Sequence, residues 1–557
     1  MSDGVQPRTA LIPARLRAAW DLVRDRGPNQ VQFWLIALGI GIASGYVAVG
    51  FMTAIRTLQT FLYGTEDPRN LHSFAATLPW WWILLLPAIG GLVVGFVLNR
   101  FTPDGRVRGV AEVIEGAALR EGRVEQRAGL ASIAASLITL SSGGSSGREG
   151  PVVHMTGLIA GWVSNRINAD GVTGREILGC AVAAAVAASF NAPLAGALFA
   201  LEVVLRHFAV HALAPITIAA ASGSVISRVH FGDVTEFTLP EPGALAFYAE
   251  LPAFVLLGLT CGLVAVALMR SIFLVEDVAT AMQSRFDIPA VLRPALSGLL
   301  LGGMAIWFPH IIGVGYETTS DALSGDLLWH EAIVFAVLKV AAVSITMGGR
   351  MGGGVFSPAL MVGALTGLAF GGVATALLPE ISGAETLYAL AGMGAVAAGV
   401  LGAPISTTLI VFELTGDWQT GLAVMVTVSI ASALASRLVD RSFFLTQLER
   451  RGVHLAAGPQ RYLLSTIRVS SIMRAPEHPR SPAADAIRRA LNDGRFVAPS
   501  DTLEKAMPMF EQGGVEFVTV ARLKDEAAPE IVGVVLHVDA LRVFSRALAE
   551  TAAEEHA

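Results

Sequence analysis

The sequence predicts an all-α integral membrane protein whose membrane part contains two homologous halves, followed by a small soluble α/β tail. Of its 557 residues, 53% are hydrophobic and 15% are charged, whereas soluble globular proteins carry about 25% charged residues. Most of the uncharged runs reach the roughly 20 apolar residues that a spanning helix needs. They show no polar face, which argues against a large soluble protein. The runs are Gly27–Ile55, Asn70–Asn99, Ile177–Leu201, Leu251–Met269, Pro294–Tyr316, Met351–Pro379, Thr386–Phe412 and Trp418–Ser436.

Residues 1–30 are predicted to form a cytoplasmic, amphipathic N-terminal segment. They contain five arginines and three aspartates and no short apolar core that ends in a cleavage site, so we expect no secretory signal. Leu11–Val23 has the pattern of an amphipathic helix lying on the membrane surface.

Arginine placement predicts the orientation of the spans. Arg100–Arg127 contains six arginines, whereas His230–Glu250 contains no lysine or arginine. By the positive-inside rule, both termini and Arg100–Arg127 are expected on the cytoplasmic side, and His230–Glu250 on the outside.

Several classes of function are disfavoured. Cys180 and Cys261 both lie in apolar runs, which favours neither a disulfide framework nor a metal site. The net charge of −6 suggests no nucleic-acid partner. An intramembrane protease would need a metal-binding His/Glu pair, a Ser/His pair or paired aspartates. His207 and His211 could share a helical face but lack the glutamate of an HExxH motif, so we expect no metal and no enzyme.

The membrane part resembles itself at an offset of 207 to 211 residues. Gly and Pro interrupt both copies, which predicts short, broken helices at corresponding places in two halves. Such breaks point to a transport site near the membrane midplane. Helix N-termini carry partial positive charge, so several of them meeting at one point would bind an anion loosely enough to release it. The matching landmarks are Gly147–Pro151 with Gly354–Pro358, Ala185–Ala188 with Ala395–Ala398, Pro193 with Pro404, and Glu202 with Glu413.

These motifs resemble the CLC family of chloride channels and proton-coupled chloride transporters. The resemblance covers about residues 31–455. It implies a fold of two inverted-topology repeats with broken half-helices, at about 31–230 and 248–440, and a homodimer with two pores. We therefore expect a multi-pass protein in the lipid bilayer of a bacterial inner membrane. The segments that carry the resemblance are Gly147–Pro151 (GREGP), Gly354–Pro358 (GVFSP), Ser141–Val153, Ala185–Glu202, Gly348–Leu360 and Ala395–Asp417.

The resemblance also implies a set of site residues. The backbone amides of Val355 and Phe356 would bind a central anion, and Glu149 would act as the gate, because an ionised carboxylate among helix N-termini mimics the permeant ion. The bland alternative for Glu149 is a first-turn glutamate that stabilises its helix dipole, but a charge at membrane depth favours a functional role. A phosphate-binding loop at Ser141–Gly150 is rejected, because the GK[ST] ending is absent. The remaining predicted anion-binding residues are Arg148, Gly150, Arg108, Gly109, Val110 and Phe444.

Three positions depart from the family pattern. Arg108 replaces a serine that contacts the anion in some members, and would either attract anions or pair with Glu112 one turn along. Phe444 falls where many members have a tyrosine, so anion binding would rest mainly on backbone amides. Val203 occupies the position of an internal proton-transfer glutamate and cannot relay a proton.

The favoured function is therefore passive or poorly coupled transport of chloride or similar small anions. A proton-coupled chloride/anion antiporter of the same fold is the alternative, and an inverted-repeat transporter of another solute is a more distant one. Glu202 and Glu413 are expected to cap or pair within the bundle. Lys339, alone in an apolar run, is expected to pack against a helix end or to snorkel.

Residues 456–557 are predicted to form a cytoplasmic tail with a single CBS-like domain at about 494–548. Nucleotide binding at a single copy is not expected, so the predicted role is dimerisation or regulation, and no cofactor is expected anywhere. Arg474–Gly494 is interpreted as an insertion or a degenerate first copy, and Lys524–Pro529 as a turn. The predicted strands are Phe496–Ser500, Glu516–Arg522 and Glu530–His537, and the predicted helices are Thr502–Gln512 and Val538–Leu548.

Overall fold

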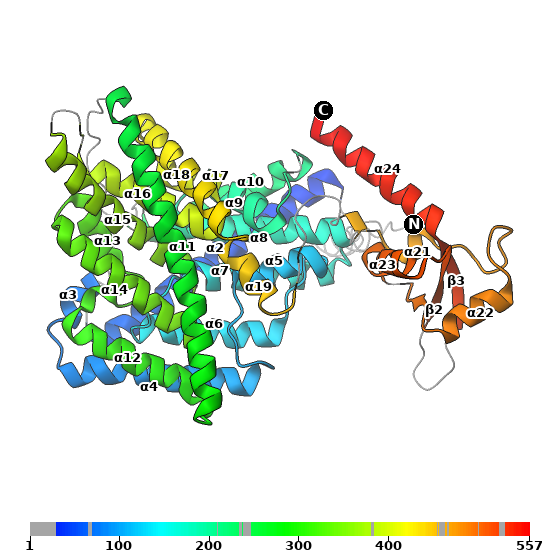
Figure 1. Ribbon diagram of the computed structural model, residues 1–557, viewed down its shortest axis with the longest axis horizontal. Helices are drawn as coiled ribbons and strands as arrows, with labels where there is room; N and C mark the ends of the chain where they lie inside the picture. Colours follow the sequence, from blue (N-terminus) through cyan, green and yellow to red (C-terminus); the bar gives the residue numbers. More distant parts are fainter. Residues whose placement is uncertain are drawn as a thin grey trace, which may run out of the picture. The chain divides into compact units, whose positions relative to one another are not determined.

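The computed structural model divides the chain into two compact units, one ending at Val453 and one beginning at His454 (Figure 1). The predicted surface helix Leu11–Val23 and the predicted turn Lys524–Pro529 lie outside the described residues. Those residues are 29–64, 70–208, 210–232, 237, 247–379, 382, 384–453, 455, 463–464, 467–499, 501–522 and 530–556.

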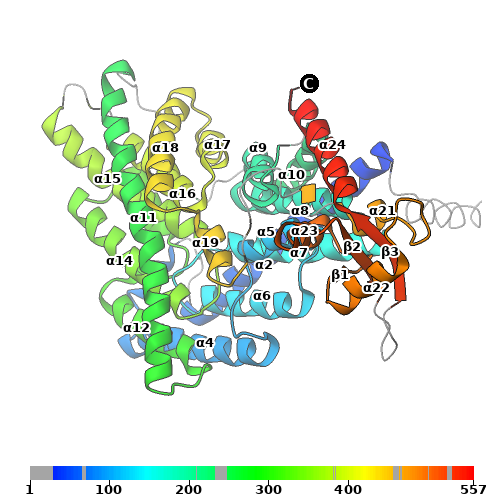
Figure 2. The ribbon, with the colours of Figure 1, turned by 45° about the vertical axis from the view of Figure 1, so that its right-hand side comes forward.

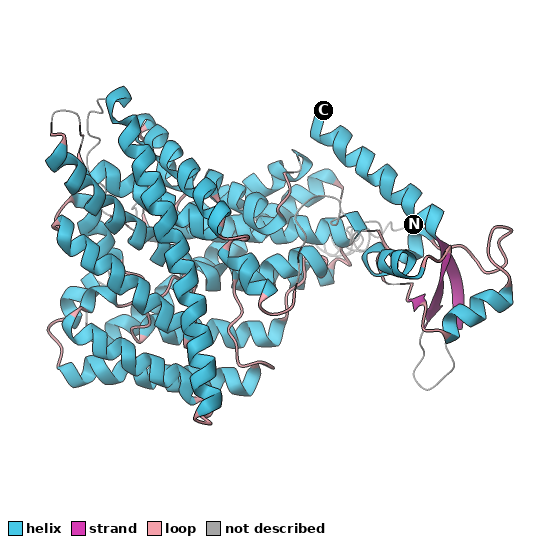
Figure 3. Cartoon of the chain, in the orientation of Figure 1, coloured by secondary structure: helices cyan, strands magenta, loops and turns pink. Residues whose placement is uncertain are grey.

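The described part of the first unit is built of helices (Figure 3). Eight of them are long and apolar enough to cross a membrane. Their outward sides carry large apolar groups such as Trp80 (64% exposed) and Phe96 (63% exposed), as a lipid-facing surface requires. The helices are α2 (Gln30–Tyr63), α3 (Leu71–Ala75), α4 (Trp80–Phe101), α5 (Val110–Leu119), α6 (Gln126–Ser141), α7 (Glu149–Arg166), α8 (Gly171–Phe190), α9 (Pro193–Phe199), η2 (Ala200–Leu205), α10 (Val210–Phe231), α11 (Phe247–Arg285), α12 (Leu292–Trp307), η3 (Pro309–Ile311), α13 (Tyr316–Ser324), α14 (Trp329–Gly348), α15 (Phe356–Leu377), α16 (Glu385–Leu401), α17 (Pro404–Thr415), α18 (Trp418–Leu438) and α19 (Phe443–Glu449).

Small residues let these helices approach closely. A Cβ atom at Gly298 of α12 would lie 2.0 Å from the carbonyl oxygen of Pro87 in α4, and these two helices lie side by side in Figure 1. At Gly363 of α15 it would lie 2.3 Å from the carbonyl oxygen of Gly392 in α16. Close contacts of this kind are how helices associate in lipid, where no hydrophobic effect drives them together.

The predicted helix breaks are present in both halves. α8 ends at Asn191 (φ 57°), and α9 begins two residues later at Pro193. α16 ends at Gly402 (φ 68°), and α17 begins two residues later at Pro404. A left-handed residue stops each helix, and a proline at the first helical position starts the next. The prediction of corresponding broken helices is confirmed.

The two halves cap each other's short helices with glutamates. The Glu202 carboxylate accepts hydrogen bonds from the backbone N–H groups of Ile405 (3.0 Å) and Ser406 (2.8 Å) at the start of α17. The Glu413 carboxylate accepts them from Leu194 (3.0 Å) and Ala195 (2.8 Å) at the start of α9. Each glutamate therefore supplies the acceptor that the other half's helix lacks, which confirms the predicted capping role.

Glu202→Ala is expected to lower the free energy of unfolding by about 2 kcal/mol, because the first turn of α17 loses a charged acceptor. The shift would be measured as a lower thermal unfolding midpoint of the detergent-purified chain. Glu125→Ala is the matched control, since Glu125 holds the cap position of α6 but makes no side-chain cap hydrogen bond. Equal shifts in the two variants would contradict the capping role.

Lys339 is fully buried on α14. Its Nζ donates hydrogen bonds to the carbonyl oxygens of Ile311 (3.2 Å) and Gly313 (3.0 Å), at the end of η3. The first of the two predicted placements, packing against a helix end, is confirmed. Snorkelling is excluded, because the ammonium group does not reach the surface.

The second unit contains a three-stranded sheet in the order β1-β2-β3, in which β1 runs parallel to β2 and β2 antiparallel to β3. The predicted strands and helices are all present, and the last helix extends to His556. Arg474–Gly494, interpreted as an insertion, contains α22, which lies against the sheet (Figure 2). The elements are α21 (Val469–Ile472), α22 (Ala484–Asn492), β1 (Phe496–Val497), α23 (Leu503–Gly513), β2 (Phe517–Arg522), β3 (Glu530–Leu536) and α24 (His537–His556).

Candidate functional site

Two loops from different halves are joined by a reciprocal pair of backbone hydrogen bonds. The N–H of Gly147 donates to the carbonyl of Gly354 (2.7 Å), and the N–H of Gly354 donates to the carbonyl of Gly147 (2.8 Å). A Cβ atom at Gly354 would lie 3.1 Å from the backbone nitrogen of Gly150, so a side chain there would press the loops apart. This glycine pair places the start of α7 beside the start of α15.

Three helix N-termini meet at a cavity of about 80 Å³. The first residues of α5, α7 and α15 line it, and each terminus offers backbone N–H groups without partners inside its helix. Such groups carry partial positive charge and attract anions. The predicted residues that line this cavity are Gly109, Val110, Glu149, Gly150, Val355, Phe356, Arg108 and Phe444.

Glu149 is the buried carboxylate of the site and is 2% exposed. Its Oε1 accepts a hydrogen bond from the Ser357 hydroxyl (2.5 Å) and lies 3.9 Å from Nε of Arg148. Among the residues that the structure describes, its Oε2 has no hydrogen-bond partner. Sequence reasoning missed Ser357, although its place in the Gly354–Pro358 motif at the start of α15 was a usable signal.

Arg148 was predicted to bind the anion with Glu149, but it does not belong to the described lining of this cavity. Its Nη2 donates to the carbonyl of Ser189 (3.2 Å), and its guanidinium lies 5.0 Å from the ring centroid of Tyr316. It lines a second cavity of about 40 Å³, which Tyr316 also lines. Arg148 and Glu149 are therefore adjacent in the chain but line different cavities.

Aromatic rings contribute to the lining of the first cavity. Phe356 packs against Phe190 (4.8 Å between ring centroids) and Phe199 (5.7 Å), while Phe444 packs against Phe443 (5.8 Å). The described lining of the first cavity includes no side-chain hydroxyl. The side-chain N–H donors in this lining belong to its arginines and to Gln447.

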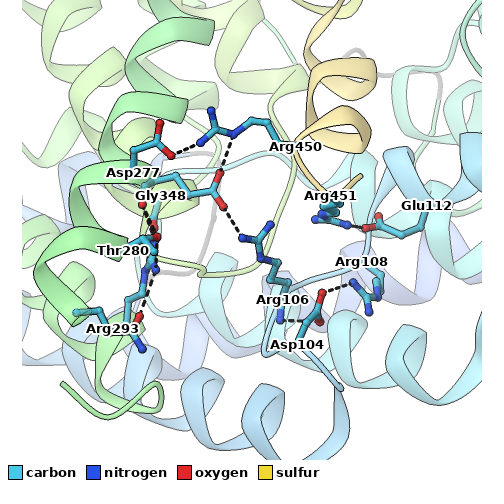
Figure 4. Close-up of polar contacts among 12 residues, drawn as sticks. Asp104, Arg106, Arg108, Glu112, Asp277, Thr280, Arg293, Gly348, Arg450 and Arg451 are labelled. Carbon is cyan, nitrogen blue, oxygen red and sulfur yellow. Dashed lines mark hydrogen bonds and ion pairs between the residues drawn. The ribbon is translucent and has the colours of Figure 1, made fainter. Parts of the chain in front are cut away.

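Arg108 pairs with Asp104 (2.9 Å) and not with Glu112 (Figure 4). The Glu112 carboxylate instead accepts from the N–H of Gly109 (2.5 Å) and pairs with Arg451. Burial works to raise the pKa of Asp104, but the hydrogen bond and charge of Arg108 outweigh it and lower that pKa overall. The predicted pairing with Glu112 is therefore wrong, because Arg451 occupies that carboxylate.

Val203 lies in η2, the π-helical turn that follows α9, and is 5% exposed. It does not belong to the described lining of either cavity. Val203 is thus a packed aliphatic side chain next to Glu202, which caps a helix of the other half.

Apolar spans, helix N-termini gathered from two halves and one buried carboxylate define an integral, multi-pass membrane transport protein. A family model described as "Voltage gated chloride channel" matches residues 90–436. A ClcB-like chloride channel protein of Ralstonia nicotianae is 33% identical over 390 residues, which cover 69% of this chain and 89% of that one. The chain belongs to the CLC family, whose members are channels or transporters and not enzymes.

Two solved structures share the fold. A slow cyanobacterial Cl⁻/H⁺ antiporter is 22% identical, with a TM-score of 0.66 over 75% of this chain and 97% of that one. A eukaryotic CLC transporter is 17% identical, with a TM-score of 0.65 over 94% of this chain and 98% of that one. The second alignment covers more of the chain than the first unit contains, so its likeness extends into the second unit.

Proposed function

We propose that this protein moves chloride or a similar small anion across a membrane through a path that Glu149 gates. The single observation that carries the proposal is the reciprocal hydrogen-bond pair between Gly147 and Gly354. It holds the starts of α7 and α15 together, so that their N–H groups and the Glu149 carboxylate all face the first cavity.

In this mechanism, the backbone amides at Val355 and Phe356 bind the anion, and those at Val110 and Gly150 add to the positive potential. The predicted Gly109 amide does not contribute, because its N–H donates to the Glu112 carboxylate. Binding without a full opposite charge keeps the ion exchangeable. The Glu149 carboxylate competes for the same volume, since both groups are anionic acceptors. Protonation of Glu149, or its displacement by an entering anion, opens the path.

Channel-like or poorly coupled conduction is the favoured mode, because Val203 cannot carry a proton. The alternative is proton-coupled antiport, and its support is the likeness to a solved Cl⁻/H⁺ antiporter. A transporter of another solute is the more distant alternative.

The test is chloride flux from liposomes that contain the purified chain, with simultaneous recording of internal pH. We expect chloride efflux without stoichiometric proton movement when valinomycin carries potassium across the membrane to balance the charge. Proton movement against the proton gradient, driven by a chloride gradient, would support the antiporter instead. Failure of the protein to move chloride under either condition would overturn the proposal and leave the other-solute alternative.

The remaining assignments belong to the same proposal. The protein works as a homodimer in a bacterial inner membrane, with both termini and the arginine-lined cavity on the cytoplasmic side. Its two repeats have inverted topology, as the exchange of caps between Glu202 and Glu413 supports. The tail is a single CBS-like module with a dimerising or regulatory role, and the protein uses no cofactor.

A further inference from the structure

The first cavity has an unusually basic wall on the side of the 102–109 loop and α19. Five arginines and three glutamates contribute to its lining. The arginines come from the loop between α4 and α5, the loop between α14 and α15, and the residues that follow α19. The question is which of these positive charges remains available to an anion.

Four of the arginines are engaged by acidic partners (Figure 4). Arg106 lies 3.4 Å from Glu276, and Arg108 pairs with Asp104 at 2.9 Å. The two that follow α19 are also engaged: Arg450 with Asp277 and, at 3.9 Å, with Glu276, and Arg451 with Glu112. Paired charges contribute little to the field felt by a third ion, because each pair is close to neutral.

Arg350 is the exception. Within the described part of the chain, its side chain makes no ion pair and no hydrogen bond, and its Nε is buried without a partner. It stands in the loop before α15 with φ 61°, and its Nη1 lies 3.9 Å from where a Cβ atom on Gly105 would be. This left-handed backbone is costly for a residue with a Cβ atom, and the guanidinium lies beside the 102–109 loop.

The surroundings of Arg350 favour an anion beside it. Burial and the neighbouring Arg106 lower the pKa of Arg350, against the opposite pull of Glu276 and Asp104. A half-buried cation that lacks a direct counter-ion is stabilised by any anion that reaches it, since burial without a partner is costly. The guanidinium offers planar N–H donors for that contact.

We propose that Arg350 forms an additional anion-binding site in the wall of the first cavity, which takes one small monovalent anion. This site is separate from the amide groups of Val355 and Phe356, which follow five and six residues later in the chain. It rests on the proposed function, because its role is to collect anions from solution and raise their concentration beside the amide site. Two neighbouring sites also help release, since an arriving anion repels the one ahead of it.

The first test measures chloride flux as a function of chloride concentration for Arg350→Gln. We expect the concentration for half-maximal flux to rise about fivefold, which is the factor that one unit charge at 4 Å is worth in water. The maximal flux should change little, because the amide site is intact. Added impermeant salt should shrink the difference between variant and unchanged protein, since it screens the charge.

Two further variants separate binding from general charge and from misfolding. Arg350→Lys keeps the charge and should keep the half-maximal concentration within about twofold. Arg285→Gln removes an exposed arginine at the end of α11 and should leave the curve unchanged. If Arg350→Gln behaves like Arg285→Gln, the proposal is overturned.

A second readout does not depend on transport. Crystals of the protein grown with bromide should show anomalous signal beside Arg350 as well as at the Val355 and Phe356 amides, and Arg350→Gln should lose only the first. Bromide at the amides but not beside Arg350 in the unchanged protein would sink this inference alone. Bromide at neither place, with no chloride flux, would instead refute the proposed function.

Discussion

Glu149→Gln is expected to raise chloride flux at neutral pH about tenfold and to remove its dependence on pH. The carboxylate is held by a charge-assisted hydrogen bond from Ser357, and hydrogen bonds to charged groups are worth about 1–1.5 kcal/mol more than neutral ones. An uncharged amide is held less firmly and competes less well with the anion. A difference of 1.4 kcal/mol is a factor of ten in the fraction of time the path is open.

The measurement is liposome flux between pH 5 and pH 8. The unchanged protein should conduct faster as the pH falls, because protonation neutralises the gate, and Glu149→Gln should be fast throughout. Glu385→Gln is the control, since Glu385 is also a first-turn glutamate, at the start of α16, but lines neither cavity. Identical pH profiles for Glu149→Gln and the unchanged protein would reduce Glu149 to an ordinary helix-dipole partner.

Gly352→Ala is expected to lower flux by at least tenfold. The new Cβ atom would lie 2.5 Å from the backbone nitrogen and Cα of Ser136 in α6, so the loop before α15 must shift. The hydrogen bond from the N–H of Gly352 to Thr139 (2.9 Å) anchors the same loop. Overpacking of this kind costs about 1–3 kcal/mol, and the shift would displace the Val355 and Phe356 amides that we propose bind the anion.

Flux per folded protein, measured after gel filtration, separates loss of the site from loss of the fold. Gly303→Ala is the matched control: nothing lies within 4 Å of a Cβ atom at that position of α12. It should leave flux unchanged and add about 0.5–1 kcal/mol of stability, as alanine does in a helix. Full flux in Gly352→Ala would mean that this loop does not position the amides.

The sequence was sufficient for features that depend on local chemistry. A proline at the first helical position, after a residue that adopts the left-handed conformation, breaks a helix wherever it occurs. Pro193 and Pro404 therefore predicted the starts of the short helices α9 and α17. The glutamates that follow them at one spacing could likewise be assigned to the bundle and not to the ion.

Long-range side-chain choices were not predictable. Ser357 holds Glu149 across 208 residues of chain, and no local pattern specifies such a bond. Arg108 lies one turn from Glu112, which made that pair plausible. Instead, Arg451, more than 300 residues away in the chain, pairs with the Glu112 carboxylate, and Arg108 pairs with Asp104.

The reciprocal bonds between Gly147 and Gly354 also limit how the pore can change shape. Two amide–carbonyl hydrogen bonds join the two halves beside the starts of α7 and α15, so rocking one half against the other there would break both. We therefore expect the backbone around Gly147 and Gly354 to stay fixed while the Glu149 side chain rotates. Opening would then take the time of a rotamer change, not that of a domain movement.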